Sequence, residues 1–303
     1  MKIYHPGKHH SGFTLAELLV AMAITVVLIS LVVAITGTAL DTWRGARNEV
    51  RASRQAKIML DALGRDLESF VVRANNDSEW LYASTSQEKI GPEGQPSPNA
   101  ATLVFLTAAS DRYGGNIGDS TEDKGGDIST VGYQLKFEDP VFADQDERYS
   151  KFVLYRNLID PDRTFQGVIG RDDLEQAYQG YAGAGSDPAN FMCENIYEFS
   201  VVFVVRYLDQ SGEDQIVRVP VIDSGALNAA QKFVIAGDEI EVDDSKPVFG
   251  DGAVISVDIS VTVLSDTGMR QIRNRTFSDD DAKAKFLAEN SYPFSKSVII
   301  PQP

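Results

Sequence analysis

The chain opens with a long apolar stretch that has a single charged residue at its start. From Leu18 to Leu40 there are 23 uncharged, mostly apolar residues, and Glu17 stands immediately before them. At about 1.5 Å per residue a helix of this length covers roughly 35 Å, enough to cross a hydrocarbon core of about 30 Å. A carboxylate at the edge of a membrane costs free energy, so Glu17 predicts a partner for its charge.

The apolar stretch continues into an amphipathic one. Apolar residues recur there at helical spacing: Leu60, Leu63, Leu67, Phe70 and Val71. The pattern predicts one helix from about Phe13 to Ala74 that stops at Asn75-Asn76-Asp77. The chain then divides into a leader (1–12), a membrane half of the helix (13–40), an amphipathic exported half (41–76) and a globular head (77–303).

The head is predicted to be rich in strands. Residues Val254 to Val263 alternate apolar with small polar side chains, which is typical of a half-buried antiparallel strand. The candidate strands are Thr102–Leu106, Val131–Phe137, Phe152–Tyr155, Ile196–Leu208, Ile216–Val221 and Val254–Leu264. Short helices are predicted at Asp172–Tyr178, Leu227–Ile235 and Asp279–Ala288, the last capped by Ser278 or Asp279. The predicted fold class is α+β: a long membrane-spanning helix packed on one sandwich-like, mostly antiparallel β head.

A short motif joins the leader to the helix. A basic leader ends at Gly12 and is followed by Phe13-Thr14-Leu15-Ala16-Glu17. This pattern resembles the N-terminus of type IV pilins and pseudopilins, although a larger aliphatic residue is more usual at Ala16. The resemblance implies that a prepilin peptidase cuts after Gly12 and that the new Phe13 amine is N-methylated. It also implies that Glu17 pairs with the free amine of a neighbouring subunit during filament assembly.

Further along the chain the resemblance becomes finer. Four features are similar to J-type minor pseudopilins of type II secretion and to the Verru_Chthon cassette protein C family: the stem Leu60–Leu67 with Arg65-Asp66-Leu67, Val131-Gly132-Tyr133-Gln134-Leu135, Leu154-Tyr155-Arg156 and the strand at Val254. Resemblance to the J type implies a place near the tip of a short filament, beside other minor pseudopilins.

Glu17 has two simpler interpretations. It can lie in the headgroup layer, where the dipole of the helix N-terminus favours a carboxylate by about 0.3–1 kcal/mol. It also falls one turn after Phe13, so it can reach the amine of its own chain. A pair between subunits in low dielectric sets register more than it adds stability, because desolvation offsets much of the attraction.

The charges are distributed unevenly. The chain has 28 basic and 44 acidic residues, and loss of Lys2 and Lys8 with the leader changes the net charge from −16 to −18, which argues against nucleic-acid binding. The stem nevertheless carries a basic face, consisting of Arg44, Arg47, Arg51 and Arg54, followed by Lys57. This face is either simply solvated or attracts phospholipid headgroups or the acidic heads of neighbouring subunits.

Membrane topology is predicted by two conflicting signals. Five basic residues follow the apolar span and two precede it, which by the positive-inside rule places the head in the cytosol. The leader motif implies the opposite, with a cytosolic N-terminus and a periplasmic head. We follow the motif and expect a single-pass protein of the bacterial inner membrane that can be extracted into a filament.

Other candidate chemistry is sparse. His5, His9 and His10 all lie in the leader, so the mature chain lacks the histidine of serine- or cysteine-dependent hydrolases. Cys193 precedes an apolar strand and is predicted to be a buried small hydrophobe. Acidic, glycine-rich loops at Asp111–Asp127 and Gly237–Gly252 are weak calcium candidates, the former through Asp119, Asp123 and Asp127.

The sequence therefore predicts a non-enzymatic filament subunit of a type II secretion or type IV pilus-like system. Its expected partners are a prepilin peptidase, other pilin-like subunits and the inner membrane, and no cofactor is expected apart from the calcium candidates. One alternative is a membrane-tethered surface binding module that forms no filament. Another is an anchored, carboxylate-dependent hydrolase, against which the lack of histidine in the mature chain counts.

Overall fold

The structure is a computed structural model. It describes residues 12, 14–71, 77–85, 90–92, 95–108, 127–141, 149–182, 187–209, 211–223, 229–242, 249 and 252–301. Several residues singled out in the sequence lie outside the described part: Phe13, the three leader histidines, Asp119 and Asp123. Parts of the two acidic loops also lie outside it. The chain forms two compact units, Met1–Glu49 and Val50–Pro303.

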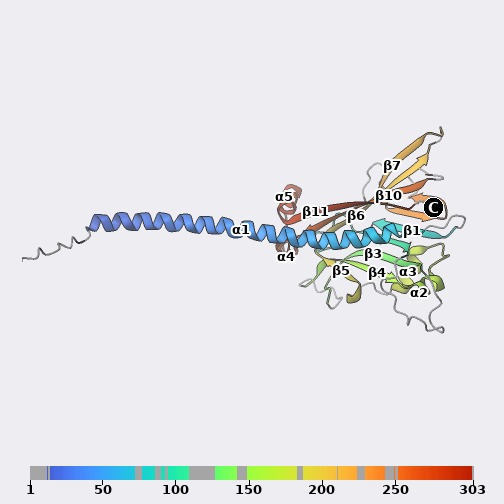
Figure 1. The fold of residues 1–303 in the computed structure, drawn as a ribbon, viewed down its shortest axis with the longest axis horizontal. Helices are drawn as coiled ribbons and strands as arrows, with labels where there is room; N and C mark the ends of the chain where they lie inside the picture. The colour runs from blue at the N-terminus through green and yellow to red at the C-terminus, as the bar shows by residue number, and fades with distance from the viewer. Residues whose placement is uncertain are drawn as a thin grey trace, which may run out of the picture. The chain divides into compact units, whose positions relative to one another are not determined.

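Helix α1, Leu15–Glu68, is the longest element (Figure 1). Its first part is exposed and apolar, and it is long and apolar enough to cross a membrane. Four hydroxyl groups within this part donate to the carbonyl four residues earlier, at 2.7–3.1 Å: Thr25 to Ala21, Ser30 to Val26, Thr38 to Ala34 and Thr42 to Thr38. These bonds satisfy the polar side chains inside the helix itself, as an apolar solvent requires.

Helix α1 ends six residues before the predicted Ala74. Phe70 forms an isolated bridge with Thr107, and the Val71 N–H donates to the Leu106 carbonyl at 3.0 Å. Both residues fit the helical spacing, but they pair with a strand instead. The predicted end was therefore wrong because a tertiary contact recruits these two residues.

The head contains two sheets in which all pairings between named strands are antiparallel. The seven-stranded sheet has the order β5-β4-β3-β2-β1-β8-β9, with β1 Glu79–Thr85, β2 Ala101–Thr107, β3 Ser129–Glu138, β4 Lys151–Ile159, β5 Phe191–Glu194, β8 Lys232–Ala236 and β9 Glu239–Val242. The four-stranded sheet has the order β11-β10-β6-β7, with β6 Ile196–Leu208, β7 Asp214–Val221, β10 Ala253–Leu264 and β11 Ser291–Ile299.

The main core lies between the two sheets and the last turns of α1. From α1 it receives Ala52, Ala56, Met59, Leu60, Leu63 and Leu67. Figure 1 shows these turns beside strands of both sheets, and α1 contacts β4 through Arg156 and β11 through Lys296. One face of residues 50–68 is therefore part of the head's interior.

Five short helices complete the described part of the head: α2 Pro161–Gly167, α3 Leu174–Ala182, the 3-10 helix η1 Pro188–Asn190, α4 Asp266–Ile272 and α5 Asp280–Asn290. A second, smaller core joins α2 and α3 to the seven-stranded sheet. There the Tyr178 ring lies directly over Gly132, where an added Cβ would be 2.2 Å from the ring. Helix α5 begins after Asp279, whose carboxylate accepts from the Ala282 N–H at 2.7 Å.

The α+β fold and all six predicted strands are confirmed, with Ile196–Leu208 matching β6 residue for residue. The helices predicted at Asp172 and Asp279 correspond to α3 and α5. The helix predicted at Leu227–Ile235 was wrong, because residues 232–236 form β8 and pair with β1; residues 224–228 lie outside the described part. The prediction missed β1, β5, β9, β11, α2 and α4.

Candidate functional site

The start of α1 carries a reciprocal cap between Thr14 and Glu17. The Thr14 backbone N–H and its hydroxyl both donate to Glu17 Oε2 at 2.9 Å, and the Glu17 N–H donates to Thr14 Oγ1 at 3.3 Å. The Leu18 N–H then makes the first helical bond, to the Thr14 carbonyl. This arrangement is a capping box, which satisfies backbone donors that the first helical turn leaves unpaired.

The cap gives Glu17 a local role that the sequence analysis missed. The signal was present, because Thr14-x-x-Glu17 before an apolar run is the capping-box pattern. Glu17 is exposed, and its two hydrogen bonds from Thr14 both go to Oε2. The carboxylate is thus held at the N-cap residue, on the backbone N–H that Thr14 contributes to its peptide bond with Phe13.

The residues of the predicted basic face have different surroundings. Arg44 pairs with Asp41 at 3.3 Å, and the Arg47 guanidinium lies 5.6 Å from the centre of the Trp43 ring. Arg51 pairs with two head carboxylates, Glu194 at 2.9 Å and Asp266. Arg54 is exposed. Arg51 therefore holds α1 to its own head, whereas Arg44, Arg47 and Arg54 face solvent.

A buried ionic cluster also fixes α1 to the head. Asp66 of α1 accepts two hydrogen bonds from Arg156 of β4, at 2.8 Å from Nε and 2.9 Å from a terminal nitrogen. The Tyr133 hydroxyl of β3 donates to the same carboxylate at 2.5 Å. Burial raises the pKa of this hydroxyl well above its usual value, and the Asp66 charge adds to the effect. Asp66, Arg156 and Tyr133 thus form one hydrogen-bonded cluster inside the core.

This cluster unites three separate segments of the sequence. Asp66, Tyr133 and Arg156 come from Arg65-Asp66-Leu67, Val131-Gly132-Tyr133 and Leu154-Tyr155-Arg156, the segments that carry the finer resemblance. Sequence reasoning did not foresee that they meet, because nothing in one sequence pairs residues so far apart. Their shared contact is the join between the stem helix and the seven-stranded sheet.

The other candidate residues are placed as follows. Cys193 is 3% exposed in β5, and burial raises the pKa of its thiol far above the usual value, as expected for an unreactive core residue. Asp127 is exposed. Among the described residues no group of three or more His, Cys, Asp or Glu side chains is arranged to hold a metal ion. The calcium loop, with Asp119 and Asp123 outside the described residues, stays a prediction.

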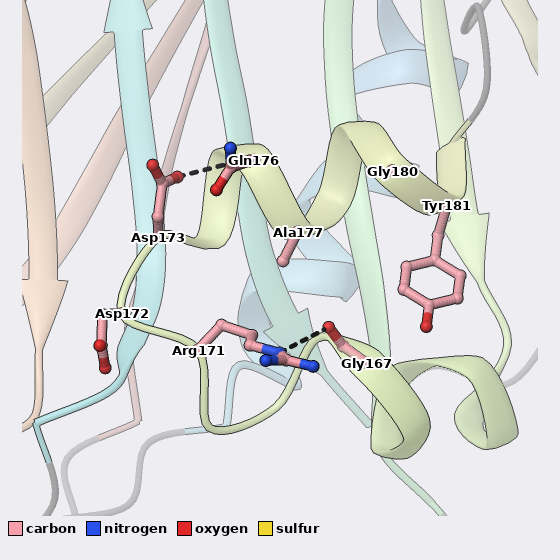
Figure 2. Close-up of a pocket in the computed structure, with 8 residues that line it drawn as sticks. All are labelled: Gly167, Arg171, Asp172, Asp173, Gln176, Ala177, Gly180 and Tyr181. Atoms are coloured by element: carbon pink, nitrogen blue, oxygen red, sulfur yellow. Dashed lines mark hydrogen bonds between the residues drawn. The ribbon is translucent and has the colours of Figure 1, made fainter.

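An open hollow lies between α2 and α3 on the outer side of the seven-stranded sheet. Figure 2 shows the Arg171 side chain extending toward Gly167, whose carbonyl accepts from its Nε at 3.3 Å. Asp173 caps α3 by accepting from the Gln176 N–H at 2.8 Å. These polar groups serve the local backbone, so the hollow has the character of a helix–helix junction rather than of an active site.

Comparison with known proteins identifies the N-terminal segment. A family model described as the prokaryotic N-terminal methylation motif matches residues 7–33. No curated protein and no solved structure matches the chain. The motif match supports a type IV pilin-like protein that is processed by a prepilin peptidase, a class of structural rather than enzymatic proteins. Together with α1, it is consistent with anchoring by a single membrane span.

Proposed function

We propose that this protein is a minor pseudopilin-like subunit of a type II secretion or type IV pilus-like filament. The observation that carries the proposal is the methylation motif at residues 7–33, which runs directly into a long apolar helix whose first turn is capped by Glu17. In this proposal the peptidase removes residues 1–12, Phe13 becomes the N-methylated first residue, and α1 holds the subunit in the inner membrane with the head in the periplasm.

The geometry of Glu17 supports a role in assembly. An ionised carboxylate has about four acceptor positions on two oxygens, and the Thr14 donors both use Oε2. Neither of the two donors of Thr14 uses Oε1. An α-amino group has a reference pKa near 8 and is mostly cationic at neutral pH. We propose that the Phe13 amine of the next subunit binds there, with the Thr14 cap holding the carboxylate in position.

The charge distribution supports a role for the head and stem surfaces. Residues 58–303 carry 21 basic and 41 acidic residues, while Arg44, Arg47 and Arg54 leave their charges toward solvent. In our proposal these arginines meet lipid headgroups or the acidic heads of adjacent subunits. From the resemblance to J-type minor pseudopilins we propose a position near the filament tip. Glu17 supports a position beneath another subunit, because a terminal subunit has no incoming amine to pair.

Mass spectrometry of the protein purified from its native membranes tests the processing step. We expect a chain that begins at N-methylated Phe13. A functional protein that retains residues 1–12 would contradict the filament proposal and leave a simple membrane tether.

Substitution of Glu17 tests the assembly step. Glu17→Ala is expected to insert into the membrane normally but to reduce stem–stem disulfide cross-linking, reported by a cysteine at Ala23, by about tenfold or more, equivalent to about 1.4 kcal/mol. Glu49→Ala removes another exposed acid of α1 and serves as the matched control. Normal cross-linking of Glu17→Ala would refute the pairing, and absence of cross-linking in the wild-type background would favour a tethered binding module.

A further inference from the structure

The segment that follows the apolar stretch of α1 carries one aromatic ring and two arginines. Trp43, Arg44 and Arg47 come within two helical turns of the last residue of that stretch, and all three are exposed, Trp43 by 60%. All lie in the compact unit Met1–Glu49. An exposed indole at the end of a membrane span is typical of the lipid–water interface, where its ring packs among lipids and its N–H meets polar groups.

The side chain of Arg47 folds back toward the apolar stretch. Its guanidinium lies 5.6 Å from the centre of the Trp43 ring, one helical turn earlier. At about 1.5 Å per residue, Trp43 is about 4–5 Å past Leu40 and the Cα atom of Arg47 is about 10 Å past it. The headgroup layer is about 5–7 Å thick on each side of the hydrocarbon core. When Leu18–Leu40 spans that core, as in the function proposed above, the Arg47 charge is therefore brought back to the depth of the headgroups.

An ion pair offsets the acidic charge that would oppose an anion at this depth. Asp41 follows Leu40 directly, and an unpaired carboxylate there would repel a lipid phosphate. The Arg44 guanidinium lies 3.3 Å from the Asp41 carboxylate. These two charges offset each other, so Arg47 supplies the net positive charge of residues 41–47.

The hydrogen-bond donors of Arg47 and Trp43 are available to a ligand. Among the residues that the structure describes, neither the Arg47 guanidinium nor the Trp43 indole N–H has a hydrogen-bond acceptor. Contact with a ring uses the face of a guanidinium and leaves its N–H donors, which lie in its plane, for an anion. A phosphate group can accept two parallel hydrogen bonds from such a guanidinium. The pair therefore combines an apolar ring with a phosphate-binding charge.

This combination favours a lipid over the acidic head of another copy. A head carboxylate would neutralise Arg47, but it would give the indole ring of Trp43 no apolar surroundings. A phospholipid supplies both a phosphate for the guanidinium and acyl chains for the ring. Arg54 is about 20 Å past Leu40, well outside the headgroup layer, so it is the arginine better placed to meet a neighbouring head.

We infer that Trp43 and Arg47 bind the phosphate of an anionic phospholipid where α1 leaves the hydrocarbon core. A zwitterionic headgroup carries its own cation, which competes with Arg47 for the phosphate, so an anionic headgroup binds better. The inference assigns Arg47 to one of the two partners proposed above, and it rests on the proposed function in placing α1 in the membrane. Within that function, the contact holds the subunit at a fixed depth until assembly extracts it.

Quenching of Trp43 fluorescence in vesicles tests the site. The full-length protein is reconstituted into mixtures of phosphatidylglycerol and phosphatidylcholine, in which one lipid or the other carries brominated acyl chains that quench tryptophan. The Trp43 signal is the difference between wild type and Trp43→Phe, because Trp80 is buried in the head. We expect about a fivefold enrichment of phosphatidylglycerol around Trp43, equivalent to about 1 kcal/mol for one basic residue at a membrane surface. Bromine near the headgroup end of the chains should quench more than bromine near their far end.

Four variants assign the enrichment to individual charges. Arg47→Gln should abolish it, whereas the matched control Arg54→Gln, which removes another exposed arginine of α1, should keep it. Arg44→Gln should reduce the enrichment, because the Asp41 charge is then unopposed. The double variant Asp41→Asn/Arg44→Gln removes both charges of that pair and should restore the enrichment.

Three results would overturn the inference. Equal quenching by the two brominated lipids in wild type would leave the acidic heads of other copies as the partner of Arg47. An enrichment that Arg47→Gln retains, or that Arg54→Gln also loses, would indicate a diffuse attraction of the whole stem. Stronger quenching from the far end of the chains would place Trp43 inside the hydrocarbon core. Each of these results leaves the filament proposal intact, because processing and the Glu17→Ala variant test that proposal separately.

Discussion

Removing the Asp66 carboxylate is expected to destabilise the head strongly. Asp66 and Arg156 have side chains only 5% and 7% exposed, and the carboxylate accepts hydrogen bonds from Arg156 and Tyr133. In Asp66→Ala the guanidinium stays in the core without its counter-charge, and the Tyr133 hydroxyl loses its acceptor. Breaking a buried pair on one side costs about 3–5 kcal/mol.

This loss is large relative to the total stability of a domain, which is about 5–15 kcal/mol. A more exposed pair, between the same helix and β11, provides the comparison. Lys296 and Asp61 are joined at 3.1 Å with side chains 31% and 45% exposed, so Asp61→Ala is expected to cost less than about 1 kcal/mol. Asp66→Leu combined with Arg156→Met and Tyr133→Phe removes both charges and the hydroxyl that bonds Asp66, and should recover much of the loss, because well-packed apolar residues often replace a buried pair without penalty.

Urea unfolding followed by tryptophan fluorescence measures these differences. The chain has two tryptophans, and Trp80 of β1 is 2% exposed, so a Trp43→Phe background isolates a reporter inside the head. The full-length protein is measured in detergent, and the midpoint and slope give the free energy of unfolding. A loss for Asp66→Ala no greater than that for Asp61→Ala would refute the conclusion that the buried cluster joins the helix to the sheet.

Two further predictions concern single groups in the head. Burial raises the pKa of Glu79, whose carboxylate accepts from the Leu174 N–H at 2.7 Å, so its stabilising contribution is present below its unfolded pKa and is lost as the pH rises through the folded one. Glu79→Gln should therefore become more stable relative to wild type as the pH rises from about 4 to about 7. Urea midpoints measured at both pH values test this, and a midpoint of Glu79→Gln that falls relative to wild type over this range would contradict it. Cys193 should react with a thiol reagent at least about a hundredfold more slowly in the folded protein than in urea, as expected for an opening free energy near 3 kcal/mol; comparable rates would show that β5 is open.

The strands were predictable where alternation is strong and long. Strand β10 was predicted within one residue because it alternates apolar and polar residues over most of its length. Strand β6 was predicted with both of its ends because it is a long run of β-branched and aromatic residues. The helix predicted around β8 was wrong because the local sequence is misleading there. Ala229-Ala230-Gln231 is typical of a helix, but Phe233 and its neighbours form a strand because they pair with β1. Local propensity was overridden there by a partner distant in the sequence.

The candidate site was predictable only in its local part. The motif from Gly12 to Glu17 is contiguous, so the sequence identified it, and the Thr14–Glu17 cap was readable from the same residues. The cluster of Asp66, Tyr133 and Arg156 depends on the helix, β3 and β4 meeting in three dimensions. No periodicity or spacing in the sequence predicts that these three residues are in contact. The division of the basic face, in which Arg51 turns to Glu194 and Asp266, likewise depends on where the head places its carboxylates.

The depth at which α1 enters the core has a practical consequence for anyone who wants the head without its anchor. Ala52, Ala56, Met59 and Leu63 of α1 are each no more than 3% exposed, so a truncation that starts at the first strand would strip away one wall of the interior and leave apolar surface open to water. A soluble fragment should instead begin upstream of Arg51, retaining the last turns of the helix and its contact with Glu194.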